Sequence, residues 1–218
     1  MRSDPCSRRS EAISINLGCQ STSSQLTGTS SRPSGNKSEI ISRNVQTMLS
    51  ALKTRTLVIG NSGSGKSTLA VRIAEFAVCP VIDLDDIHWE ENRASKKRDE
   101  SLAIQMTTSI TDEPKWVIEG VYGWLADFVT PRATALIWLN LPWHECKAGL
   151  ERRGSSHGAT DIQFNELLEW AQRYWTRQTS SSFAGHSKIF EHFRGKKLTL
   201  ISRVDIEEFS KFLAPEVS

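Results

Sequence analysis

A glycine-rich segment at residues 60–68, with the sequence GNSGSGKST, holds the residues whose types and spacing are best suited to chemistry. It has the spacing GxxxxGK[ST]. In such a loop glycines let backbone amides point at phosphate oxygens, the lysine neutralises the β- and γ-phosphates, and the next hydroxyl binds magnesium. The segment therefore predicts a P-loop that binds a nucleoside triphosphate with Mg²⁺, and ATP is the expected nucleotide. The residues predicted to bind it are Gly60, Asn61, Ser62, Gly63, Ser64, Gly65, Lys66, Ser67 and Thr68.

The residues on either side of the loop meet the structural requirement of the motif. Residues 56–59 predict a strand, and residues 67–70 predict the first turn of a helix, whose N-terminus adds a partial positive charge beside the phosphates. We assign a catalytic role to Lys66, on the transferred phosphoryl group, and a metal-binding role to Ser67. The tighter spacing GxxGxGK[ST], which includes Gly63, is typical of small kinases that phosphorylate metabolites and nucleotides.

Carboxylates lie at the end of the second predicted strand, within the sequence IDLDDIHW at residues 82–89. Parallel α/β sheets bind ligands beyond the carboxyl ends of their strands, so an acid there can hold a magnesium-bound water or accept the proton of an attacking hydroxyl. Asp85 is the first candidate for this catalytic role and Asp83 the second; capping of the next helix is the alternative. His88 is expected either to bind the acceptor or to pack, and Trp89 either to stack on an acceptor ring or to cover the core.

Further acceptor-side candidates lie around the third predicted strand, in the sequence WVIEGVY. Glu119 is expected to face the same cleft as Asp85, where it binds the acceptor or the magnesium shell, or else pairs with a nearby basic residue. Gly120 would let a substrate approach the backbone closely. Arg132 is an additional acceptor-site candidate. Asn140, at the end of the fourth strand, stands where many P-loop proteins have a magnesium-binding Asp, which argues against a motor-type ATPase.

Arginines that can stabilise a transferred phosphoryl group follow the fourth predicted strand. Arg152 and Arg153 end a predicted helix directly before the sequence GSSHG, which has the composition of a hinge. We therefore name both as catalytic candidates on a short lid at residues 152–178. Arg173 and Arg177 follow one turn apart on the next predicted helix. For each single arginine, a solvated position on the surface is the alternative.

Short β-branched runs that alternate with helical patterns predict one three-layer α/β domain at residues 48–218. Residues 1–47 are rich in Ser, Thr, Asn and Gly and are expected to be a disordered extension, with a targeting segment or an incorrectly assigned start before Met48 as alternatives. Strands are expected at 55–59, 80–84, 115–119, 133–140 and 197–201. Helices are expected near 66–77, 95–110, 143–153, 161–178 and 205–213.

Composition narrows the class of protein. The 218 residues include 27 basic and 25 acidic side chains, for a formal net charge of +2, which favours neither nucleic acid nor a membrane surface as the main partner. The four cysteines lie far apart, without a CxxC pair, and no apolar run reaches the roughly 18 residues of a membrane span. We expect a soluble, cytoplasmic monomer or homodimer whose partners are ATP and a small acceptor.

Taken together, these motifs resemble the adenylate-kinase-like small P-loop kinases, and in particular their bacterial branch of topology modulation proteins, over about residues 54–213. The likeness rests on the P-loop, on the sequences LD and IHW around Asp85, on WVIEGVY, on IWLNLP and on the two adjacent arginines before the hinge. It implies a five-stranded parallel sheet in the order 2-3-1-4-5 and transfer of the γ-phosphate of ATP to a small acceptor. The branch commonly has Asp where this chain has Glu119, Ala135 and Asn140, so the resemblance implies a different metal shell.

The acceptor stays open at this point. The lid is shorter and the arginine pattern less complete than in adenylate kinases, so AMP is one acceptor among several. The sequence DDIH resembles sugar-acid kinases and adds a polyol or a sugar acid. A second hypothesis is a regulatory nucleotide-binding protein with weak NTPase activity. The chain has no recognisable DNA-binding module or basic stripe, which favours the kinase.

Overall fold

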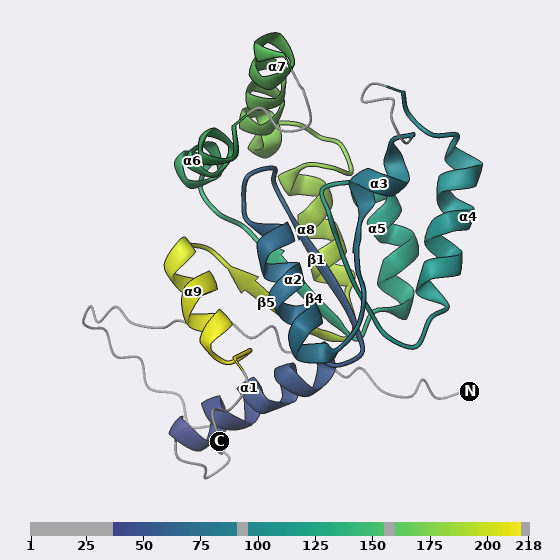
Figure 1. The fold of residues 1–218 in the computed structure, drawn as a ribbon. Helices are drawn as coiled ribbons and strands as arrows, with labels where there is room; N and C mark the ends of the chain where they lie inside the picture. Colours follow the sequence, from purple (N-terminus) through teal and green to yellow (C-terminus); the bar gives the residue numbers. More distant parts are fainter. Residues whose placement is uncertain (1–36, 91–95, 155–159, 215–218) are drawn as a thin grey trace, which may run out of the picture.

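The structure is a computed structural model that describes residues 37–90, 96–154 and 160–214. Five strands form one parallel sheet in the order β2-β3-β1-β4-β5, and helices flank it (Figure 1). This confirms the predicted three-layer α/β fold and the order 2-3-1-4-5. The strands are β1 (Arg55–Gly60), β2 (Val81–Asp83), β3 (Trp116–Gly120), β4 (Ala135–Leu139) and β5 (Lys196–Leu200).

Helices cover both faces of the sheet because its strands are apolar on both sides, as expected for a parallel sheet. The α-helices are α1 (Lys37–Leu52), α2 (Lys66–Ala77), α3 (Leu84–His88), α4 (Glu100–Thr111), α5 (Gly123–Val129), α6 (Trp143–Arg153), α7 (Asp161–Gln172), α8 (Phe183–His192) and α9 (Arg203–Lys211). Val58, Ile137 and Leu198 pack under α1, α2 and α9, whereas Leu57 and Leu136 pack under α3, α4, α5 and α8 (Figure 1). Two 3₁₀ turns are η1 (Thr130–Arg132) and η2 (Arg173–Trp175).

Helix α1 differs from the sequence-based expectation, because it begins at Lys37, inside the segment that was expected to be disordered. Met48 and Leu52, four residues apart and therefore on one helical face, are buried in the core beneath the sheet. The hydroxyl of Thr134 donates to the carbonyl of Ala51 (2.9 Å), which fixes the end of the helix to the strand edge. Polar residues surround these few apolar positions in the sequence. The composition of the segment therefore predicted disorder rather than a helix. The prediction for residues 1–36 lies outside the described residues.

Other differences arise where short helices connect the strands. The predicted strand at 80–84 is only three residues long, because the carboxylate of Asp83 accepts a hydrogen bond from the amide of Asp85 (2.8 Å) and starts α3. Helices α5 and α8 had no counterpart among the expected elements. The predicted helix at 161–178 ends at Gln172 and continues into η2.

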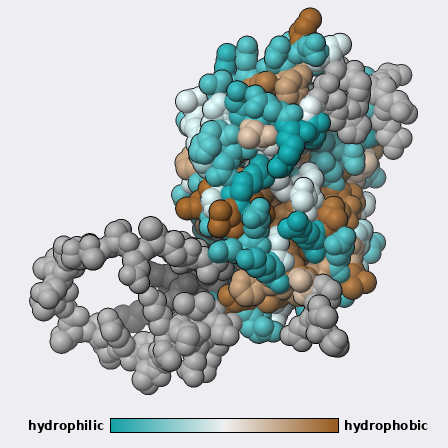
Figure 2. Space-filling view, turned by 60° about the vertical axis from the view of Figure 1, so that its left-hand side comes forward, coloured by the Kyte–Doolittle hydropathy of each residue, from teal (hydrophilic) through white to brown (hydrophobic). Residues whose placement is uncertain are grey.

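On the face shown in Figure 2, hydrophobic residues form small groups that hydrophilic residues separate. Among the described residues, no helix combines the length and the apolar character that a membrane span needs.

Candidate active site

The predicted P-loop connects β1 to α2 at the carboxyl edge of the sheet. Its backbone takes left-handed conformations at Gly63 (φ 76°) and Gly65 (φ 98°), where a side chain would be strained. A Cβ on Gly63 would also collide with the backbone of Cys146 on α6. Glycine is therefore required at both positions for the loop to pass under α6 and turn into the N-terminus of α2, which is the anion-binding end of that helix.

Lys66 occupies the centre of the site. Its side chain is largely buried, and its ammonium donates to the carbonyl of Asn61 (3.2 Å) and lies 4.0 Å from a carboxylate oxygen of Glu119. Glu119 is itself 2% exposed at the end of β3. The structure thus brings together the predicted phosphate-binding lysine and the predicted strand-end acid, and the ion pair that sequence reasoning weighed as an alternative is formed.

Carboxylates from the ends of β2 and β3 lie near this lysine. Asp83 lies opposite Glu119 in the β2–β3 register, and Asp85 follows it by two residues. Burial first, and then the negative charges of Glu119 and Asp85, raise the pKa of Asp83 to about 7, whereas Lys66 acts in the opposite direction. Together the carboxylates of Asp83, Asp85 and Glu119 carry more negative charge than Lys66 can balance. This part of the site therefore favours the binding of a cation.

The oxygen donors here fit Mg²⁺ held partly by nucleotide phosphates. Carboxylate and hydroxyl oxygens are its preferred ligands, and Mg²⁺ in phosphate sites is bound through one or two protein oxygens rather than by a full protein cage. The described residues contain no group of three or more His, Cys, Asp and Glu side chains that could hold a metal ion on their own. Ser67 at the start of α2 and the acids at Asp83 and Glu119 are the residues that would hold the ion or its waters.

Asp83→Asn is expected to change how stability depends on pH in the nucleotide-free protein. The folded-state pKa of about 7 lies above the ordinary aspartate value of 3.8, so this carboxyl stabilises the fold below pH 3.8 and loses that contribution as the pH rises through about 7. Asparagine keeps the cap of α3 but does not titrate. Between pH 5 and 8 the free energy of unfolding of the wild type should fall on the order of 1–2 kcal/mol more than that of the variant, after allowance for solvent screening. Urea unfolding at the two pH values measures this, and parallel curves would contradict it.

Aromatic side chains form a wall next to Asp85. The ring of His88 stacks on Tyr122 (4.0 Å between centroids), and the indole of Trp89 donates to the Tyr122 hydroxyl (2.9 Å). Trp124 lies edge-on to His88 (6.0 Å). Burial and the charge of Asp85 raise the pKa of the Tyr122 phenol, and burial lowers the pKa of His88. We call these four side chains, His88, Trp89, Tyr122 and Trp124, the aromatic wall; all of them are half-buried.

Some predicted site residues lie elsewhere or have another role. Arg132 forms an ion pair with Asp112 (3.0 Å), so its guanidinium is occupied away from the P-loop. A Cβ on Gly120 would press against the side chain of Leu84, so packing of α3 is by itself a reason for glycine here, and the role of Gly120 in substrate access stays a prediction.

The two predicted lid arginines lie at the end of α6. Arg152 and Arg153 are exposed in its last turn, and Gly154 follows with a left-handed φ of 69°. The rest of the predicted hinge, residues 155–158, lies outside the described residues. The catalytic role of these arginines stays a prediction.

Arg203 is a site residue that sequence reasoning missed. It follows β5 in the first turn of α9, and its guanidinium donates to the carbonyls of Gly63, Ser64 (2.8 Å) and Glu145 (3.2 Å). The backbone amide of Arg203 also donates to the Glu145 carboxylate (2.9 Å). Arg203 therefore fixes the outer side of the P-loop to α6. A cation at a helix N-terminus opposes the helix dipole, and this unfavourable position was the one available signal in the sequence.

Arg203→Met is expected to loosen the phosphate-binding loop. Loss of hydrogen bonds from a charged donor to partly buried carbonyls should lower the free energy of unfolding by about 2 kcal/mol and weaken ATP binding roughly tenfold. Thermal melts and calorimetric titration with Mg·ATP measure the two effects. Arg72→Met, which removes an exposed cation on α2, is the matched control and should change neither. Wild-type ATP affinity in the Arg203 variant would show that the loop keeps its shape without this contact.

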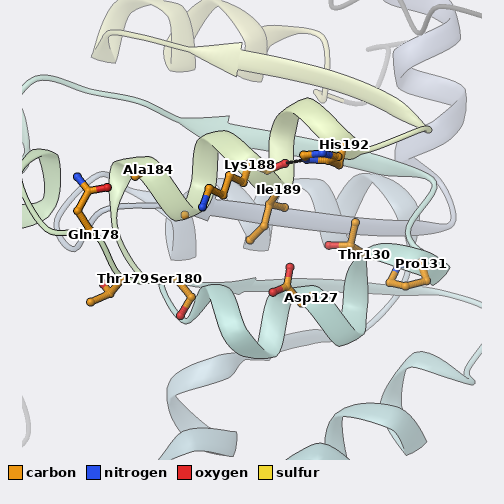
Figure 3. A pocket seen from close by; sticks show the side chains of 11 residues that line it. Asp127, Thr130, Pro131, Gln178, Thr179, Ser180, Ala184, Lys188, Ile189 and His192 are labelled. Atoms are coloured by element: carbon orange, nitrogen blue, oxygen red, sulfur yellow. Dashed lines mark hydrogen bonds between the residues drawn. The ribbon is translucent and has the colours of Figure 1, made fainter.

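A separate hollow of about 420 Å³ lies between α5 and α8 (Figure 3). Asp127 points into it from α5, and Lys188 and His192 line it from α8. None of its lining residues belongs to the P-loop, the carboxylate group or the aromatic wall, so it lies outside the candidate active site.

Comparison with known proteins gives a likeness to solved structures only. No protein-family model and no curated protein matches the chain. A shikimate kinase from Bacteroides thetaiotaomicron is 18% identical, with 73% of this chain and 95% of that one covered and a TM-score of 0.45. A gluconokinase from Sinorhizobium meliloti 1021 is 15% identical (74% and 90% covered, TM-score 0.47), and a deoxyadenosine kinase from M. mycoides is 12% identical (72% and 95% covered, TM-score 0.42). At these values their substrates say nothing about this chain, and its assignment to the P-loop α/β class rests on its own sheet order and on the glycine-rich loop between β1 and α2.

Proposed function

We propose that this protein is an ATP-dependent phosphotransferase that moves the γ-phosphate of Mg·ATP to a small-molecule or nucleotide acceptor. The observation that carries the proposal is the position of Lys66 between the P-loop and the carboxylates at the ends of β2 and β3. One side of the lysine thus faces the predicted phosphate-binding loop and the other faces the carboxylates. That is the arrangement expected when a phosphoryl group passes from one to the other.

The reaction follows from these positions. The acceptor hydroxyl attacks the γ-phosphorus while the bond between that phosphorus and the β,γ-bridging oxygen breaks, and ADP leaves. Lys66 neutralises charge on the phosphate oxygens, and the proton of the hydroxyl passes to Asp85. When bound, Mg²⁺ neutralises the charge on the β- and γ-oxygens. Pre-positioned charges of this kind lower the barrier because they need no reorganisation during the reaction.

The aromatic wall supports an acceptor with a flat or ring-shaped apolar face. Half-buried rings beside an exposed carboxylate offer a stacking surface and a hydrogen-bond acceptor to the same molecule. A nucleoside or nucleotide and a cyclic polyol both fit this description. Membership of the bacterial branch of topology modulation proteins, which the sequence motifs resemble, remains part of this proposal.

Calorimetric titration of the full chain tests the donor side of the proposal. We expect binding of ATP that requires Mg²⁺ for full affinity and that a non-hydrolysable ATP analogue reproduces. Equal affinity for ATP with and without Mg²⁺, or no binding of either nucleotide, would contradict a Mg·ATP-dependent transferase.

A further inference from the structure

Helix α3 carries much of the acceptor side of the candidate active site. Asp85 and His88 belong to it, and Trp89 follows it directly. The helix has only five residues, which is little more than one turn. A single turn is not stable by itself, because its first hydrogen bond does not offset the cost of fixing the backbone. Asp85 and two members of the aromatic wall therefore depend on other contacts for their positions.

The first turn of α3 is held by its own neighbours. Leu84 and Ile87 are buried in the core, and the Asp83 carboxylate caps the helix through the amide of Asp85 (2.8 Å). The carbonyl of Asp85 accepts from the amide of Trp89 (2.9 Å). The carbonyls that follow Asp85 need partners from outside the helix, as at every helix C-terminus.

Arg98 supplies those partners. Its Nε donates to the carbonyl of Ile87 (2.9 Å), and its Nη2 donates to the carbonyls of Asp86 (3.2 Å) and Trp89 (2.9 Å). Its backbone amide donates to the carbonyl of His88 (2.8 Å). A single residue thus binds four successive carbonyls at the end of α3.

The chemistry of the guanidinium suits this position. A planar group with several N–H donors can bind more than one carbonyl at once, and its positive charge is favourable at the C-terminal end of a helix. Hydrogen bonds from a charged donor are also stronger than neutral ones. The backbone beside Arg98 adds to the attachment, because Lys97 pairs with Trp89 in an antiparallel bridge and the Lys96 carbonyl accepts from the amide of Glu90 (3.0 Å).

We propose that Arg98 is a positioning residue, which holds α3 so that Asp85 lies where it accepts the proton of the acceptor hydroxyl. The inference rests on the proposed function, in which Asp85 is that proton acceptor. Arg98 is half-buried, and its Nε and Nη2 are occupied by backbone carbonyls, so it acts through the helix rather than on the substrate. A displacement on the order of 1 Å at a reacting group costs roughly a hundredfold in rate.

Arg98→Met replaces the guanidinium by an uncharged side chain of similar length. We expect kcat for phosphoryl transfer to fall by about tenfold to a hundredfold. The affinity for Mg·ATP should stay within about twofold, because other contacts hold Lys66 and the P-loop. Arg98→Lys should recover part of the rate, since an ammonium keeps the charge at the end of the helix but not the planar set of donors. Arg72→Met, which removes an exposed cation on α2, is the control and should keep the wild-type rate.

The double variant Arg98→Met with Asp85→Asn separates positioning from a general structural role. If Arg98 acts through Asp85, its replacement should cost no more than about twofold in rate once residue 85 can no longer accept a proton. Loss by the same factor in both backgrounds would overturn the inference, because Arg98 would then act independently of Asp85. Equal losses of Mg·ATP affinity and transfer rate in both single variants at position 98, with lower melting temperatures, would also overturn it.

The outcomes separate the inference from the proposed function. Transfer is measured with nucleosides, nucleoside monophosphates, sugar acids and cyclic polyols as acceptors. A wild type that phosphorylates none of them contradicts the proposed function, and the inference with it. A wild type that phosphorylates one of them, together with an Arg98→Met variant that keeps the wild-type rate, contradicts only the positioning role of Arg98.

Discussion

Lys66→Ala is expected to lower ATP-dependent phosphoryl transfer by about a thousandfold or more. The Lys66 ammonium lies between the P-loop carbonyl of Asn61 and the carboxylate of Glu119. Its loss removes the charge that balances the γ-phosphate oxygens. It also removes the positive charge beside the carboxylates of Asp83 and Glu119. Their negative charges would then repel the phosphates of the incoming nucleotide.

Turnover, ATP affinity and thermal unfolding of this variant are to be measured together. Lys66→Ala should still unfold cooperatively, because the core on both faces of the sheet does not depend on this side chain. Lys147→Ala, which removes an exposed lysine that pairs with Glu151 on α6, is the matched control and should keep wild-type turnover. Full activity of the Lys66 variant would contradict the proposed mechanism.

Asp85→Asn is expected to lower phosphoryl transfer by at least about a hundredfold while Mg·ATP affinity changes little. Asp85 lies at the start of α3, next to the aromatic wall and two residues from Asp83. Asparagine has nearly the same shape, and the backbone N–H at this position can still donate to Asp83. Its side chain, however, cannot accept the proton of an attacking hydroxyl. The loss should therefore appear in the maximal rate rather than in the affinity for ATP.

The neighbouring Asp86→Asn provides the control for this prediction. Asp86 is also exposed and also lies in the first turn of α3, so it matches Asp85 in charge, in helix position and in solvent access. If both variants lose activity equally, the general negative charge of this turn matters rather than a proton acceptor at Asp85. If neither loses activity, the proton acceptor is another group.

Local patterns predicted the part of the site that is continuous in sequence. The P-loop could be found because its glycines, lysine and hydroxyl have fixed spacing, and the carboxylates at Asp83 and Glu119 because each ends a recognisable strand. Their proximity followed from the parallel sheet, in which the carboxyl ends of β2 and β3 meet at one edge. The strand order itself came from the family resemblance and not from periodicity.

Contacts between distant parts of the chain could not be predicted in this way. Arg203 reaches the P-loop across about 140 residues of sequence, and nothing near it in the chain specifies that contact. The burial of α1 depends on two apolar side chains that meet the sheet only after folding. The ion pair of Arg132 with Asp112 could not be predicted for the same reason, since Asp112 comes from another part of the chain.

The most direct test of the account is an acceptor screen with Mg·ATP that follows ADP release and the mass of the phosphorylated product. Nucleosides, nucleoside monophosphates, sugar acids and shikimate-like polyols cover the acceptors that the aromatic wall and the carboxylates admit. The account predicts that at least one class gives a phosphorylated product in a reaction that requires Mg²⁺ and Lys66. Tight binding of ATP without a product from any of these acceptors would contradict it and would favour a regulatory nucleotide-binding protein.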